Sequence, residues 1–87
     1  MTTATTLTDE DFQWKLAKIS KHGYTDFDNE NDCTKAIIFL RSYGVTLKGG
    51  KEYYREAETN DFIIEPTKSN AKRIANIVKQ EFGIDPY

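Results

Sequence analysis

The chain has 87 residues, with 12 lysines and arginines against 14 aspartates and glutamates, and a formal net charge of −2. This length allows one hydrophobic core, so we expect one domain. The charge balance argues against a strongly basic nucleic-acid binder and against an acidic mimic of DNA. Residues 1–34 carry seven acids and three bases, whereas residues 35–87 carry seven acids and nine bases, so the first part is acidic and the second slightly basic.

Cysteine content and the N-terminus indicate the compartment. Cys33 is the only cysteine, which excludes a disulfide within one chain and a zinc site built from cysteines. The threonine-rich residues 1–6 lack the basic and apolar parts of a secretory signal, and no apolar run approaches the roughly 20 residues of a membrane span. We therefore expect a cytoplasmic protein with no membrane partner.

The first predicted helix spans residues 9–22. Thr8 is a typical N-cap, Asp11 stands at the capping-box position, and Gly23 suits a left-handed stop. An alternative is that residues 11–18 form an edge strand, because three of their apolar side chains alternate with period two. The helix is favoured, since apolar residues recur at helical spacing at Phe12, Leu16 and Ile19.

A helix over residues 9–22 turns Trp14 away from this apolar stripe, because each residue advances by about 100°. Two interpretations are open. The N-terminal tail or the 24–30 loop covers the indole, or the indole anchors a partner, since tryptophan is enriched at interface hot spots.

Residues 25–32 are polar and acidic, and they predict a linker before a second helix at roughly 30–43. Alternating acids from Asp26 resemble the start of a calcium loop. The loop then requires a glycine where Asn31 stands and a bidentate glutamate where Ile37 stands, so a capped helix start is the better interpretation. No metal or other cofactor is expected.

The second half of the chain predicts a sheet and a closing helix. Residues 45–47 and 52–55 flank the glycine pair 49–50, which predicts a hairpin with a basic tip at Lys48 and Lys51. A third strand is expected at 62–64. The last helix is capped by Thr67 or Ser69 and ends at Gly83, with an apolar face opposite a basic face that includes Lys72, Arg73 and Lys79.

These elements give a small single domain of the α+β class. It consists of two N-terminal helices, a three-stranded antiparallel meander and a C-terminal helix. We expect a flexible N-terminus over residues 1–7, the domain over residues 8–83 and a short tail over residues 84–87.

The sequence contains no convincing catalytic group. His22 lies at a predicted helix end, and Cys33 lies on an apolar helix face, where a thiolate is disfavoured. The glycine pair between Lys48 and Lys51 lacks the preceding glycine and following Ser/Thr of a phosphate loop. We therefore expect that the protein is not an enzyme.

The expected function is protein binding, as a small inhibitor or adaptor of a phage or other mobile element. The residues predicted to bind the partner are aromatic or acidic, namely Trp14, Tyr53, Tyr54, Asp26, Asp28 and Glu30. The alternative is a winged-hairpin accessory protein that binds nucleic acid through Lys48, Lys51, Lys72, Arg73 and Lys79. A homodimer remains open, with Ile77 at the border of the last helix's apolar face.

Overall fold

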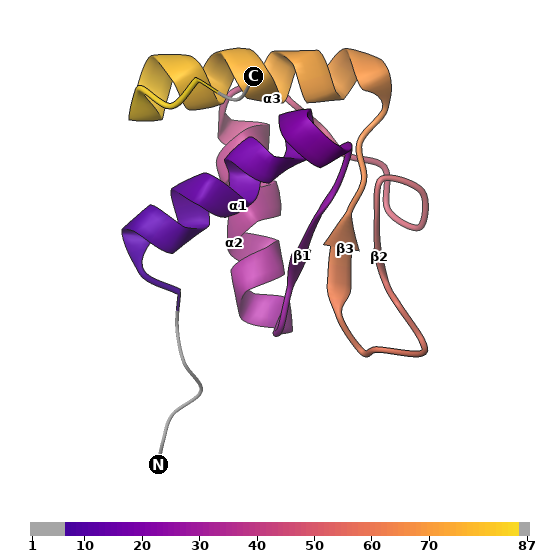
Figure 1. The fold of residues 1–87 in the computed structure, drawn as a ribbon. Helices are drawn as coiled ribbons and strands as arrows, with labels where there is room; N and C mark the ends of the chain where they lie inside the picture. The colour runs from indigo at the N-terminus through magenta and orange to yellow at the C-terminus, as the bar shows by residue number, and fades with distance from the viewer. Residues whose placement is uncertain (1–6, 86–87) are drawn as a thin grey trace.

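The computed structural model describes residues 7–85, and it has three helices and a three-stranded antiparallel sheet (Figure 1). The α+β class is therefore confirmed. The alternative edge strand over residues 11–18 is wrong, because this segment is helical. Residues 1–6 and 86–87, in the predicted flexible N-terminus and tail, lie outside the described part. In chain order the elements are α1 (Asp9–His22), β1 (Thr25–Phe27), α2 (Glu30–Ser42), β2 (Tyr53–Arg55), β3 (Phe62–Ile64) and α3 (Lys68–Phe82).

Local capping sets the helix ends. The Thr8 side chain accepts a hydrogen bond from the backbone N–H of Asp11 at 3.1 Å, which begins α1. Gly23 ends α1 with a φ of 86°, in the left-handed region that glycine adopts without steric cost. Of the two candidate caps for α3, Thr67 is the one used, because its hydroxyl accepts from the N–H of Asn70. The predicted helix bounds agree closely with these.

The sheet is three-stranded and antiparallel, as predicted, but its order is β1-β3-β2 and not that of a meander, and its first strand is a different segment. Its first strand is Thr25–Phe27, within the segment predicted as a linker, and residues 45–47 are not a strand. The predicted hairpin of residues 45–47 and 52–55 is therefore wrong. Residues 48–52 instead fold into a compact turn, in which the bridge between Gly49 and Tyr53 is parallel. β3 instead pairs with β1 on one side and β2 on the other, both antiparallel.

The hydrophobic core lies between the sheet and the helices. In Figure 1, α2 runs behind β1, and α3 lies along the top of the molecule with the end of α1 beneath it. Contacts of α2 with β1 and β3, and of α1 with α3, enclose the core. Its largest fully buried side chains include Phe27, Leu16, Ile19, Leu40, Ile64 and Ile74.

An aromatic cluster joins the three helices at one end. Phe39 of α2 stacks on Phe82 of α3 at 5.5 Å between ring centroids. Phe12 of α1 contacts the Phe39 ring edge-on, at 5.8 Å between centroids. Tyr43 completes the cluster, and its hydroxyl donates a 2.7 Å hydrogen bond to Glu81. Such aromatic pairs contribute beyond their buried area, so this cluster fixes the helices relative to one another.

Candidate functional site: an exposed sheet face bordered by α1

One face of the sheet is turned away from the core, and we call it the outer sheet face. The register places Asp26 of β1, Ile63 of β3 and Tyr54 of β2 directly opposite one another, so their side chains share this face. In the next row, Thr25 and Ile64 point the other way and are fully buried. Among residues 7–85, no helix crosses in front of β3 or β2 in the view of Figure 1. With strands about 4.8 Å apart, the row spans about 10 Å.

The outer sheet face is acidic at its β2 side. The Tyr54 hydroxyl donates a 2.8 Å hydrogen bond to Glu65. This bond, burial and the charges of Glu65 and Glu56 raise the pKa of Tyr54 above its ordinary value of 10.0. The hydrogen bond places the Glu65 carboxylate against the tyrosine, and Glu56 adds negative charge on the same side.

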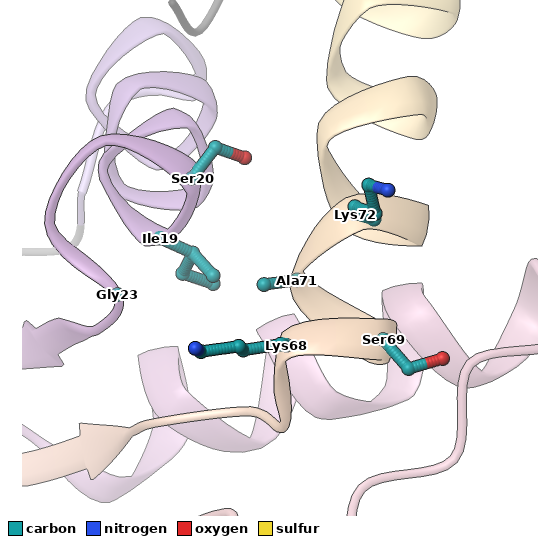
Figure 2. Close-up of a pocket in the computed structure, with 7 residues that line it drawn as sticks. All are labelled: Ile19, Ser20, Gly23, Lys68, Ser69, Ala71 and Lys72. Atoms are coloured by element: carbon teal, nitrogen blue, oxygen red, sulfur yellow. The ribbon is translucent and has the colours of Figure 1, made fainter.

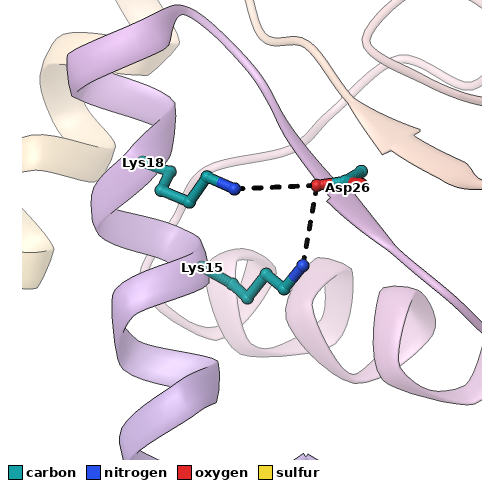
Figure 3. Close-up of polar contacts among 3 residues, drawn as sticks. All are labelled: Lys15, Lys18 and Asp26. Carbon is teal, nitrogen blue, oxygen red and sulfur yellow. Dashed lines mark ion pairs between the residues drawn. The ribbon is translucent and has the colours of Figure 1, made fainter.

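Helix α1 borders the same face at β1. The ammonium groups of Lys15 and Lys18 lie 3.6 Å and 3.8 Å from Oδ1 of Asp26 (Figure 3). Lys15 also lies 5.9 Å from the ring centroid of Phe27. Partly exposed ion pairs contribute little to stability, so these contacts mainly set where the two lysine side chains and Asp26 lie on the surface.

Trp14 extends this surface along α1. It lies four residues before Lys18, so the two side chains are neighbours on the helix. The residue is 52% exposed, in agreement with the prediction that it faces away from the core. A continuous path therefore runs from Trp14 through Lys18, Asp26 and Ile63 to Tyr54. We call it the Trp14–Tyr54 surface.

Three of the residues predicted to bind a protein are not part of this path. Tyr53 lies on the core side of the sheet, opposite to the face of Tyr54, and its ring packs against Gly49. Asp28 is exposed in the bend after β1, and Glu30 is exposed in the first turn of α2. The structure thus brings together Trp14, Asp26 and Tyr54 of the predicted set.

Sequence reasoning missed Lys15, Lys18, Ile63 and Glu65. The strand 62–64 consists of three apolar residues, so it carries no alternation that would tell which side chain points outward. The two lysines are ordinary charged residues of a helix face until β1 places Asp26 beside them.

The residues predicted to bind nucleic acid lie apart from this path, in the turn before β2 and on α3. Lys48 and Lys51 are exposed in the turn before β2, and Lys72, Arg73 and Lys79 are exposed on α3. This turn and the start of α3 are held together by Glu52, which is only 7% exposed. The Glu52 carboxylate accepts hydrogen bonds from the backbone N–H of Lys48 at 2.9 Å, the backbone N–H of Thr67 at 3.0 Å and the side-chain amide of Asn70 at 2.8 Å. We call this arrangement the Glu52 clasp.

The acidic segment before α2 is organised as a helix cap. Asn29 accepts from the N–H of Asp32 and donates to its carboxylate, both at 2.9 Å. Asp26 is directed toward the lysines of α1 instead. Within residues 7–85, no group of three or more His, Cys, Asp and Glu side chains has the arrangement of a metal site.

Cys33 is buried on the core side of α2. Burial, followed by the charge of Glu30, raises the pKa of its thiol from 9.0 to about 11. The thiolate is the reactive form, so this cysteine is a poor nucleophile at neutral pH. His22 is exposed at the end of α1.

Alkylation of Cys33 by iodoacetamide at pH 7.5 is expected to be at least roughly tenfold slower in the folded protein than in the urea-unfolded chain. Both burial and the raised pKa of the thiol act in this direction. Mass spectrometry of samples quenched over time gives both rates. Equal rates would contradict the buried position of the thiol.

No helix within the described range of the chain is long and apolar enough to cross a membrane. Comparison with known proteins finds no significantly matching family model, curated protein or solved structure.

Proposed function

We propose that the protein is a cytoplasmic, non-enzymatic protein-binding module, which acts as a small inhibitor or adaptor through the Trp14–Tyr54 surface. The observation that supports this most directly is the outer sheet face, which no helix of the described residues covers and which α1 extends with an exposed tryptophan. Tryptophan and tyrosine are the residues that most often dominate binding energy at interfaces, and here they stand at the two ends of one surface.

The charges on this surface define the chemistry of the partner. Ile63 is half-buried in the middle of the row, while Glu56 and Glu65 place two carboxylates beside Tyr54. The carboxylate of Asp26 is balanced by its two lysines. A complementary segment would therefore combine an apolar or aromatic side chain over Ile63 with lysine or arginine near Tyr54. We propose such a basic segment of another protein as the partner.

A selection from random twelve-residue peptides displayed on phage tests this proposal. The immobilised protein should enrich peptides in which basic and apolar residues are mixed. Trp14 is the only tryptophan of the chain, so its fluorescence should change when an enriched synthetic peptide binds. Trp14→Ala and Tyr54→Ala should each weaken binding tenfold or more, which is the effect of a hot spot. Binding to Trp14→Ala, which has lost the fluorescent residue, is followed through a label on the peptide.

Ile38→Ala provides the matched control. Ile38 is 56% exposed on the outer side of α2, so it is as accessible as Trp14 but lies on another surface. Its substitution should leave peptide affinity within about twofold, and circular dichroism should show all three variants folded. Peptides that bind Trp14→Ala and Tyr54→Ala as tightly as the parent protein would overturn the proposal.

A further inference from the structure

A second surface lies where the end of α1 meets the start of α3. A groove of about 640 Å³ separates residues 19–23, at the end of α1, from residues 68–72 of α3. Its apolar lining comes from Ile19 and Ala71. Figure 2 shows Lys68 extended toward the Gly23 side of the groove, with Lys72 one turn further along α3.

The Glu52 clasp brings two more cations to this end of the molecule. Its carboxylate binds the N–H of Thr67, the residue immediately before Lys68, and the N–H of Lys48. The exposed side chains of Lys48 and Lys51 therefore lie on a turn that is fixed against the first turn of α3. We call Lys48, Lys51, Lys68 and Lys72 together the basic end.

The charges at the start of α3 are unusual for a helix. The N-terminal end of a helix carries a partial positive charge and usually has acidic residues beside it. The first turn of α3 has no acid and includes Lys68. Glu52 is the acid that packs against this turn, and its carboxylate is already engaged by three hydrogen bonds. Among residues 7–85 none of the four lysines of the basic end forms an ion pair. Apart from the attraction between Lys48 and the Glu52 carboxylate, their charges are therefore available to an anion from solution.

We infer that the basic end binds the phosphate backbone of a nucleic acid. Lys68 and Lys72 are four residues apart, about 6 Å along the helix axis, and the other two lysines lie on a different element. A chain of phosphates can meet cations spread in this way, whereas one small anion meets only a part of them. The net charge of −2 is no obstacle, because exposed charges more than about 8 Å apart are largely screened at physiological salt.

This inference is independent of the proposed protein-binding function, because it concerns other residues and another ligand. Contacts to phosphates alone carry no base specificity, so binding should depend on salt rather than on sequence. Four phosphate contacts predict that affinity falls between 50 and 200 mM NaCl by roughly 50-fold for single-stranded DNA and roughly 150-fold for a duplex.

Fluorescence anisotropy with a labelled 20-nucleotide DNA, single-stranded and as a duplex, tests the inference. Lys68→Glu and Lys72→Glu should each weaken binding about fivefold or more at 50 mM NaCl and reduce the salt slope by about one. Circular dichroism and urea unfolding of both variants should match the parent protein, so that a loss of binding cannot be attributed to unfolding.

Lys35→Glu is the matched control. It makes the same change of charge, but Lys35 lies over Phe12 at the start of α1, at the end of this helix opposite the groove. It should change the affinity less than twofold and leave the salt slope unaltered. No DNA binding by the parent protein at 50 mM NaCl would overturn the inference. An equal loss in Lys35→Glu, or binding to phosphatidylserine vesicles and not to DNA, would overturn it as well.

Discussion

Phe27→Ala is expected to lower the free energy of unfolding by about 3–5 kcal/mol, because it removes a large buried side chain and leaves a cavity. The Phe27 side chain is fully buried on the core side of β1. A domain of this size has a stability of only about 4–13 kcal/mol, so the variant should lose a large part of it. Urea unfolding followed by circular dichroism measures the change.

Asp28→Ala provides the comparison for Phe27→Ala. Asp28 is the next residue along the chain and is exposed, so its substitution should change stability by no more than about 0.5 kcal/mol. If segment 25–27 were a linker, the two substitutions would have similarly small effects. A cost below about 1 kcal/mol for Phe27→Ala would contradict the presence of β1 in the core.

The helices were predictable because their signals are local. Thr8 and Thr67 cap their helices through hydrogen bonds to residues three positions ahead, and Gly23 and Gly83 end them with positive φ. Each of these signals lies within one turn of the helix end that it determines, so it can be read without knowing the rest of the fold.

The strands were not predictable to the same degree, because pairing is not local. Residues 25–27 and 45–47 share a burial pattern in which the first and third side chains are buried. Only the first segment finds a pairing partner, in β3, more than 30 residues later in the chain. In the second, the N–H of Val45 binds the carbonyl of Leu40, and the carbonyl of Thr46 accepts from the Asn70 side chain. The partner, rather than the pattern, decides which segment is a strand.

The Trp14–Tyr54 surface also has one part that local sequence signals predict and one part that depends on strand pairing. The outward position of Trp14 follows from the helical period alone. Its connection to Tyr54 depends on β1, because Asp26 lies between the lysines of α1 and Ile63 of β3. Because residues 25–32 were interpreted as a linker, Asp26 could not be placed in the sheet. Trp14 and Tyr54 were therefore predicted as binding residues, but not as parts of one surface.

Glu52→Ala is the substitution that most directly tests how the second half of the domain is held together. It removes the acceptor of three hydrogen bonds whose donors belong to the turn before β2 and to the start of α3. Leaving partly buried donors without an acceptor costs about 1–3 kcal/mol for each group that water cannot reach. We expect a loss of about 2–4 kcal/mol at pH 7. Glu58→Ala, in an exposed turn, should cost less than about 0.5 kcal/mol.

The dependence of this loss on pH identifies the carboxylate as its cause. Burial by itself raises the pKa of the Glu52 carboxyl, but the hydrogen bonds of the clasp and the charge of Lys48 outweigh it and bring the pKa below 4.5. A carboxyl whose pKa is lower in the folded than in the unfolded state stabilises the fold above the unfolded value, and this contribution disappears as the pH falls through the folded value. The difference in stability between the parent protein and Glu52→Ala should therefore be largest at neutral pH and shrink below about pH 4.5.

Urea titrations of both proteins between pH 7 and pH 3 measure this difference. Glu52→Gln adds a second test, because its amide keeps one acceptor but presents a donor to the N–H groups of the clasp, so it should be destabilised at pH 7 as well. A difference that stays constant across this range would mean that Glu52 acts through packing and not through its charge. In that case the charge of Glu52 would not be what holds the turn with Lys48 and Lys51 against the start of α3.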